Sequence, residues 1–299
     1  MRKSLLILLC AALSFQLFGQ SLPSLLVPTD AGVLGQANTS LAGKAGAFAA
    51  DVNLSKAVFS PETLSAGVSY GLWAPKTAND KVLGVGAFYK LEKLAFGLSV
   101  KNFTMQPYTP TSANGSVSQT EDPYTPKEFS IGLGAAFLLG DAFSLGVTAR
   151  LASSALGNDA KGVAVGLDLS ASYVKNAFSA SLALCNLGPS VKYGENSYAQ
   201  PMLVKAGASY EFLQGLRAQA QADVLFSGGF MGGIGAEYGW RDLLFARAGF
   251  HFGSGRQATA TYASAGLGVH VVGICLDAAY VFMGENLRNT LLVTVGYSF

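Results

Sequence analysis

The stretch LLVTVGYSF, residues 291–299, decides the fold because it alternates between two kinds of side chain. Every second position, from Leu291 to Phe299, carries a large apolar side chain, and a threonine, a glycine and a serine stand among the positions between. Successive side chains of a β-strand point to opposite faces, so this rhythm predicts a strand with one apolar and one more polar face. Residues 241–252 repeat the pattern.

Segments with the same two-residue rhythm fill the chain from Leu64 to Phe299, where helical periodicity is absent. They predict an all-β fold of about fourteen antiparallel strands. The expected ranges are 64–74, 81–91, 94–105, 127–139, 142–153, 162–174, 176–186, 201–212, 216–226, 230–239, 243–252, 259–270, 273–282 and 290–299.

The expected connections alternate between tight turns, such as Glu92-Lys93 and Gly140-Asp141, and longer loops. Outer-membrane barrels have short periplasmic turns and long outer loops, so the alternation predicts a closed transmembrane barrel with both chain ends on the periplasmic side. The longest loops, 107–126 and 187–200, are expected to project outward, where recognition usually resides.

Composition points to the same class. Half of the 299 residues are hydrophobic and 13% are charged, against roughly 25% charged in soluble domains. A formal net charge of +2 gives no electrostatic reason to expect a nucleic-acid partner.

The apolar run from Leu5 to Phe18 follows Arg2 and Lys3 and predicts a signal peptide, cleaved after Gly19 or Gln20. The rest of the chain has no run of about 18 uninterrupted apolar residues, which a spanning helix needs. In lipid every backbone polar group must be paired within the protein, and a closed barrel achieves this. We therefore expect the outer membrane of a diderm (Gram-negative-type) bacterium, with outer-membrane lipid as a partner.

Residues 21–63 do not alternate and mix small residues with Asp30, Lys44 and Asp51. We expect a pre-barrel segment that enters or underlies the lumen; the alternative is a disordered periplasmic leader. The domain boundaries are then 1–20 for the signal peptide, 21–63 for this segment and 64–299 for the barrel.

The polar face of the strands carries charges that pair across hairpins. A hairpin centred on Gln214 places Lys205 opposite Asp223 and Glu211 opposite Arg217, and both pairs are opposite in sign. A Lys or Arg on the lipid face costs roughly 2 to 4 kcal/mol at the midplane, so this face is expected to be the lumen.

A turn centred near Asp242 likewise places Glu237 across from Arg247 and Gly233 across from His251. The predicted lumen-lining residues are Lys205, Asp223, Glu211, Arg217, Glu237, Arg247 and His251. Lys101, Arg150, Asp168 and Asp277 also fall on inner faces. A ligand passage and a set of salt bridges that merely fill the interior are both open interpretations.

No catalytic, cofactor-binding or metal site is expected. His251 and His270, the only histidines, are predicted near the outer and the periplasmic end of their strands. At about 3.3 Å per residue they should lie most of a membrane thickness apart, which disfavours a paired-histidine site. His251 beside an acid is the remaining basis for an enzyme at the barrel rim. Cys185 and Cys275 are also predicted at opposite ends, which disfavours a disulfide.

Three features carry a family resemblance. A small-residue run, Leu41 to Ala47, is followed by Asp51 and by SPETL at 60–64; Asn186-Leu187-Gly188-Pro189 ends a strand; and Phe299 is terminal. In these features the chain resembles the PorV/PorQ family, within the long-chain fatty acid transporter (FadL)-like barrels.

The resemblance implies a fourteen-stranded barrel with an N-terminal segment in its lumen, and a terminal Phe299 that the barrel assembly machinery recognises. It implies no catalytic residues. It also implies two roles: passage of small hydrophobic molecules, or service as a shuttle or attachment component of type IX secretion.

Our first hypothesis is passive transport of small hydrophobic or amphipathic molecules. The second is an interaction protein whose loops 106–126 and 187–200 hold a secreted client protein. An enzyme at the rim is the third.

Overall fold

The computed structural model describes residues 21–109, 123–157, 160–255 and 257–299. The signal peptide expected at 1–20 and the centre of the outer loop expected at 107–126 lie outside these ranges. Within them, no helix is long and apolar enough to cross a membrane.

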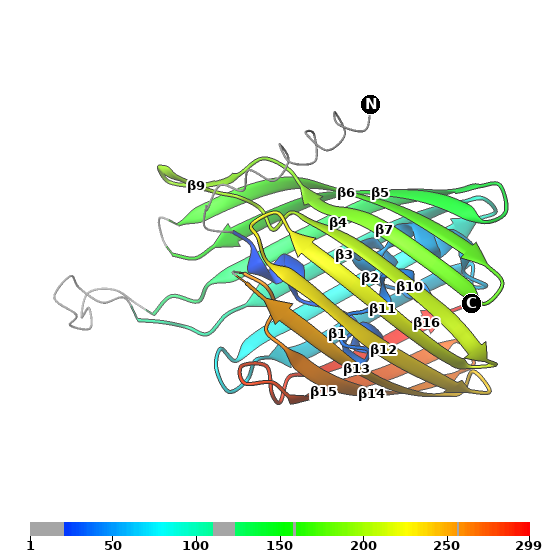
Figure 1. Ribbon diagram of the computed structural model, residues 1–299. Coiled ribbons are helices and arrows are strands. Elements are labelled where there is room, and N and C mark those ends of the chain that lie inside the picture. The colour runs from blue at the N-terminus through cyan, green and yellow to red at the C-terminus, as the bar shows by residue number, and fades with distance from the viewer. Residues whose placement is uncertain (1–20, 110–122, 158–159, 256) are drawn as a thin grey trace, which may run out of the picture.

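The described residues form sixteen strands, fourteen of which close into one antiparallel barrel (Figure 1). Each barrel strand pairs with the barrel strands before and after it in the chain, and β1 closes the ring against β16. The strands are β1 Leu64–Trp73, β2 Asp80–Leu91, β3 Leu94–Thr104, β4 Lys127–Leu139, β5 Phe143–Ala155, β6 Lys161–Lys175, β7 Phe178–Leu187, β8 Val191–Tyr193, β9 Asn196–Tyr198, β10 Leu203–Leu213, β11 Leu216–Leu225, β12 Phe230–Trp240, β13 Leu244–Ser254, β14 Tyr262–Val271, β15 Ile274–Met283 and β16 Leu291–Ser298.

The prediction of a fourteen-stranded antiparallel barrel is confirmed. The largest difference in a strand boundary is three residues, at the start of β14, where 259 was expected and Tyr262 is observed. The two-residue rhythm fixes the strands because exposure follows it: along β5, Leu145 and Leu151 are about half exposed, whereas Ser144 and Arg150 are buried.

The tight turns gather at one end of the barrel, together with the C terminus, and the longer connections gather at the other (Figure 1). We call these the short-turn end and the long-loop end. At the short-turn end, Gly140 has a φ of 64° between β4 and β5, a conformation that glycine adopts without strain.

The remaining two strands, β8 and β9, form a small hairpin in the loop expected at 187–200. Val191 and Tyr193 of this hairpin are buried against Leu22, Ala152 and Ala164. These two side chains therefore face the lumen side of the wall at the long-loop end, and the exposed Lys192 between them points the other way.

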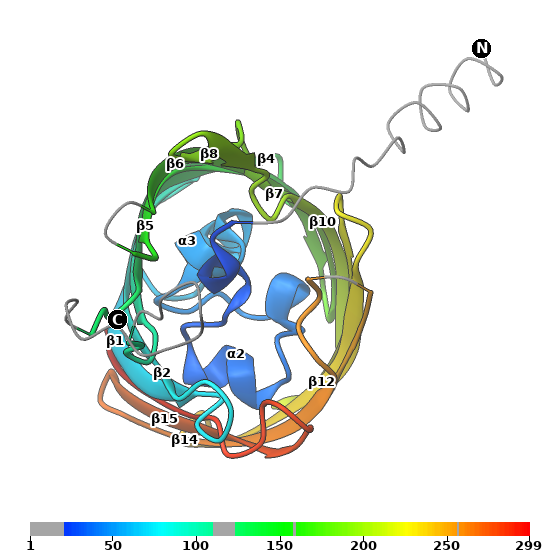
Figure 2. The same ribbon diagram turned by 90° about the vertical axis from the view of Figure 1, so that its left-hand side faces the viewer.

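Residues 21–63, which we call the lumen segment, lie inside the barrel (Figure 2). They form short helices: η1 Pro23–Leu26, α2 Ala31–Gly35, η2 Ser40–Ala42, α3 Ala49–Val52 and η3 Leu54–Phe59. The side chain of Asp30 caps α2 by accepting from the Gly32 N–H, and Asn53 caps η3 in the same way through Ser55.

Glycines on the inner face of the wall leave room for the lumen segment. A Cβ added at Gly86 would lie 2.7 Å from the Ala47 carbonyl oxygen, and one at Gly235 would lie 2.8 Å from the Gln36 carbonyl oxygen. Both distances are too short for a real side chain, so the wall and the segment are shaped to each other.

Candidate functional site

The interior of the barrel, where the lumen segment meets the wall, is the candidate site. Asp51 of α3 lies between two cations of the wall: one carboxylate oxygen is 3.2 Å from Lys101 Nζ and the other is 3.0 Å from Arg150 Nη1. The Thr29 hydroxyl donates to Asp51 at 2.8 Å. Arg150 Nη2 also lies 3.0 Å from the Asp168 carboxylate. We call Asp51, Lys101, Arg150 and Asp168 the Asp51 cluster.

The Asp51 cluster is balanced in charge, with two cations and two carboxylates, and Lys101 and Arg150 are 3% and 5% exposed. Burial alone would raise the pKa of Asp51, but Lys101 and Arg150 reverse this effect and hold that pKa below its usual range. The lumen segment is therefore pinned to the wall through an ionised carboxylate.

The Asp51 cluster continues to the outer loop. Asp168 accepts a 2.6 Å hydrogen bond from the Asn186 N–H, beside a bulge at which β6 and β7 change register. The Asn186 side chain donates to the Pro201 carbonyl at 3.0 Å, and Gln200 donates to the carbonyls of Val165 and Pro189. Side chains thus hold both ends of the loop between β7 and β10.

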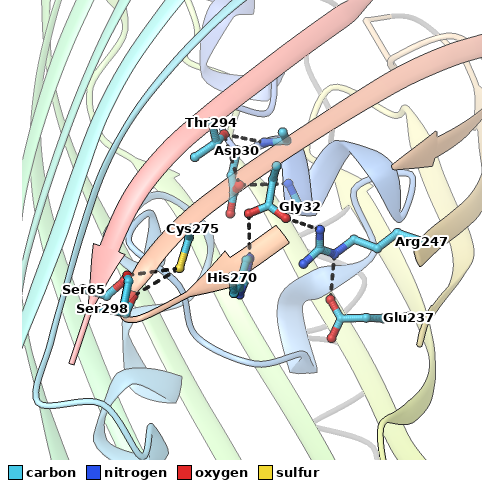
Figure 3. Close-up of polar contacts among 12 residues, drawn as sticks. Asp30, Gly32, Ser65, Glu237, Arg247, His270, Cys275, Thr294 and Ser298 are labelled. Carbon is cyan, nitrogen blue, oxygen red and sulfur yellow. Dashed lines mark hydrogen bonds and ion pairs between the residues drawn. The ribbon is translucent and has the colours of Figure 1, made fainter. Parts of the chain in front are cut away.

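A second cluster, drawn in Figure 3, lies on β12 to β15 within a few residues of the turns at the short-turn end. Arg247 Nε is 2.7 Å from the Glu237 carboxylate, and Arg247 Nη1 is paired with Asp277. The other oxygen of Asp277 is 3.1 Å from His270 Nε2. We call Arg247, Glu237, Asp277 and His270 the Arg247 cluster.

Asp30 of the lumen segment lies beside the Arg247 cluster, where it caps α2, and Thr294 Oγ1 accepts from the Ala31 N–H at 2.9 Å. Burial, and then the nearby Asp277 carboxylate, raise the pKa of Asp30 from 3.8 to about 6. Arg247 and the hydrogen bond from Gly32 oppose this rise without cancelling it, so docking of the segment here is weakened when Asp30 is ionised.

The predicted lumen-lining pairs occupy the following positions. Lys205 is directly opposite Asp223, and Glu211 is directly opposite Arg217. The Arg217 guanidinium lies 2.8 Å from Glu211. Asp223 is buried and accepts from Gln221 Nε2 at 2.9 Å. Lys205 faces a cavity of about 30 Å³ that is also lined by Asp51 and other lumen-segment residues.

Glu237 and Arg247 are likewise directly opposite, as are Gly233 and His251. The His251 ring is 2% exposed and stacks on Tyr262 at 4.8 Å between centroids. In the described part of the chain, His251 Nε2 has no hydrogen-bond partner, and no group of three His, Cys, Asp or Glu residues could hold a metal ion.

The sequence did not reveal that Asp51 and Asp30 join the segment to the wall. A signal for these contacts was present in the sequence. A buried charge needs a partner of opposite sign, and Lys101 and Arg150, on the predicted inner faces, had no acidic residue predicted opposite them across a hairpin. Spacing along the chain could not say which carboxylate meets which cation.

Apolar clusters occupy the long-loop end of the interior. Leu22 packs with Val191 and Tyr193, Leu26 with Leu203 and Met231. A larger cluster joins Val27 and α2 to the outer ends of several strands, through Trp73, Phe103, Tyr262, Val281 and Leu287. The mouth is therefore apolar above a charged middle.

Comparisons with known proteins give the family and the fold. A family model described as Type IX secretion system protein PorV matches residues 14–226. No curated protein matches the sequence.

Solved structures with the same fold include the toluene transporter TodX of Pseudomonas putida, with a TM-score of 0.68 and 12% identity over 95% of this chain and 99% of that one. The toluene transporter TbuX of Ralstonia pickettii has a TM-score of 0.66 and 12% identity over 89% and 98% of the two chains. A FadL homologue of Pseudomonas aeruginosa has a TM-score of 0.61 and 12% identity over 91% and 99%. The barrel is thus FadL-like in fold, and the chain belongs to the PorV family.

Proposed function

We propose that the mature chain lies in the outer membrane of a diderm bacterium and passes small hydrophobic or amphipathic molecules inward without energy coupling or chemical change. The outward face supports the location. Its middle is aliphatic, with Ile234 and Leu267 at 64% and 70% exposed. Exposed aromatic side chains flank this band, including Trp240 and Tyr297 at the short-turn end and Phe252 at the long-loop end.

The proposed precursor has a signal peptide at 1–20, the lumen segment at 21–63 and the barrel at 64–299, with Phe299 presented to the barrel assembly machinery. The lumen-lining role proposed for Lys205, Asp223, Glu211, Arg217, Glu237, Arg247 and His251 is to keep the interior polar around the segment.

The observation that carries the transport proposal is the apolar mouth. A hydrophobic solute that enters from outside would meet one apolar cluster around Leu26 and Met231 and another around Tyr193, and beneath them a segment that is not part of the wall. TodX and TbuX, which share the fold, are described as toluene transporters.

The lumen segment has to shift for a solute to pass. The cavity beside Lys205, of about 30 Å³, holds about one or two water molecules. A cavity of this size is too small for an alkyl chain, since ligand pockets measure roughly 300 to 1,000 Å³.

A reversible lock tests this proposal. A Cβ at Gly207 would lie 3.3 Å from the Cβ of Leu41, close to the separation in a disulfide. L41C/G207C, made in a C185S/C275S background, joins η2 of the segment to β10. Proteoliposomes take up a fluorescent fatty acid when this variant is reduced, and uptake falls at least tenfold when it is oxidised.

The matched control is S65C/S298C, which joins two wall strands whose hydroxyl oxygens lie 2.7 Å apart and leaves the segment free. Its uptake is the same oxidised and reduced. Equal uptake by the locked and unlocked L41C/G207C barrel would show that the segment does not gate a passage.

A second candidate function is a PorV-like shuttle or attachment component that holds a secreted client protein on its outer loops. The family match favours it, and so does the anchoring of the loop between β7 and β10 by Asn186 and Gln200. A pull-down of secreted proteins with the intact barrel, and with a barrel whose residues 190–199 are replaced by a short Gly-Ser linker, tests it. Client captured by the intact barrel alone supports this function.

A further inference from the structure

One place on the barrel, outside the interior, combines exposed lysines with exposed apolar side chains. The place is the long-loop end of β4, β5 and β6, at the rim of the wall, where Ser153, Lys161 and Val163 face outward and Ser154 faces the lumen. A cavity of about 530 Å³ opens there, lined by Ser153, Ser154, Lys161, Val163, Ser190 and Lys192.

The strand register brings a third lysine, Lys127, close to this cavity. Ala155 of β5 pairs with Lys127 of β4 on one side and with Lys161 of β6 on the other, so all three side chains point to the same face. Both lysines are exposed. Adjacent strands are about 4.8 Å apart, so the two lysine positions are about 10 Å apart with a small alanine between them.

The next outward-facing row toward the short-turn end is mostly apolar. It contains Phe129, Ser153 and Val163, directly paired across the same strands, and Phe129 and Val163 are 43% and 67% exposed. Leu151 and Val165 follow in the row after that, at 50% and 59%. A cationic row thus borders an apolar one on the same surface.

The opposite wall differs. At the long-loop ends of β11, β12 and β13, outward-facing positions carry Val224, Phe230 and Phe252, each more than 40% exposed. The outward-facing strand ends of this wall therefore carry aromatic and aliphatic side chains where β4 and β6 carry Lys127 and Lys161.

We propose that this sector, which we call the lysine sector (Lys127, Lys161 and Lys192), binds the phosphorylated headgroup of an outer-leaflet lipid. The lysines would contact the phosphate, hydroxyls such as Ser190 would donate to its oxygens, and the acyl chains would lie over Val163 and Val165. The proposal rests on the outer-membrane location, because only there does the apolar row face lipid.

Charge and surface type select this occupant. An acidic peptide would pair with the lysines but would make no contact with the apolar rows below them. A lipid without an anionic group would cover the apolar rows and leave the lysines unpaired. A phosphorylated lipid contacts both.

Native mass spectrometry of the full mature chain in dodecyl maltoside tests the proposal, with phosphatidic acid and phosphatidylcholine as probes. One phosphatidic acid molecule stays bound to the wild type and phosphatidylcholine does not. K161S/K192S weakens phosphatidic acid binding about 30-fold, as expected for two lysines near a phosphate, and K161R/K192R keeps it. K175S is the matched control, because Lys175 is exposed at the other end of the same strand.

Equal binding of both lipids, or unchanged binding by K161S/K192S, would overturn the proposal. So would glycerol 3-phosphate binding as tightly as phosphatidic acid, which would show a site for a soluble phosphate, or an acidic peptide displacing the lipid. The change of gel mobility on heating, which folded barrels show, confirms that each variant is folded. A chain that fails to enter liposomes would instead refute the outer-membrane location, so the two failures are distinguishable.

Discussion

The Asp51 and Arg247 clusters differ in how they hold the lumen segment. At the Asp51 cluster the segment contributes a carboxylate to two wall cations, Lys101 and Arg150. At the Arg247 cluster the segment contributes Asp30, but Arg247 is already paired with Glu237 and Asp277. The first contact is attractive, and the second is unfavourable when Asp30 is ionised, because Asp30 is buried beside Asp277.

The difference indicates that one side of the segment is fixed and the other can leave. α3 stays on the wall because breaking its ion pairs would strand buried charges. α2 is held by apolar packing and by the hydrogen bond from the Ala31 N–H to the Thr294 hydroxyl, against the cost of burying the ionised Asp30. A passage through the barrel would therefore open on the side of β13 to β16, where α2 packs, and the L41C/G207C lock opposes this opening by holding η2, which follows α2 in the chain.

The largest effect is expected from Arg150→Met, which removes the charge at the centre of the Asp51 cluster. Asp168 loses its cation and Asp51 keeps Lys101 alone. Removing one partner of a buried ion pair costs about 3 to 5 kcal/mol. Urea unfolding of the detergent-solubilised chain measures this loss. A cost below about 1 kcal/mol would show that the segment is not pinned here.

The strands and the hairpin pairs could be predicted from the sequence because both depend on residues that are close together in the chain. The rhythm of residues such as Leu291 and Val293 fixes which face is buried, and a tight turn at Gln214 then fixes that Lys205 faces Asp223. The contact of Asp51 with Arg150 joins residues far apart in sequence, and it depends on how a non-periodic segment fits between glycines of the wall. No local pattern encodes that fit.

The next largest effect is expected from Asp30→Asn, which removes the buried negative charge beside Asp277 and keeps the α2 cap. The pKa of Asp30 is raised from 3.8 to about 6 in the docked segment. The docked state therefore binds the proton more tightly, so this contribution to docking is complete below about pH 4 and is lost as the pH rises through 6. At pH 7 the variant docks more tightly by about 3 kcal/mol.

Hydrogen exchange of residues 31–35 reports this docking. In the wild type, protection of α2 falls between pH 4 and 7; in the Asp30→Asn variant it stays level. Identical pH profiles for the two chains would mean that another group governs the α2 contact.

A smaller effect is expected from bulky side chains introduced between the wall and each side of the lumen segment. Gly86 lies against Ala47 and Phe48, next to α3, and Gly249 lies against Gln36 and Ala37, next to α2. Gly86→Leu costs about 1 to 3 kcal/mol of unfolding free energy, because the pinned side cannot retreat. Gly249→Leu costs less, because α2 moves away. Limited proteolysis separates them: cleavage within 30–40 rises for Gly249→Leu, and a rise for Gly86→Leu instead would reverse the assignment.

The smallest effect is expected from Arg217→Ala. Arg217 pairs with Glu211 at 2.8 Å, a distance much like those in the Asp51 cluster, but Glu211 is about a third exposed. Water replaces the lost partner there, so the cost is below about 1 kcal/mol and shrinks further in salt. Measured beside Arg150→Met in the same urea titration, it separates burial from charge: two arginines with equally short carboxylate contacts differ several-fold in effect. Equal losses would mean that burial and the contact with the lumen segment add nothing to the Asp51 cluster.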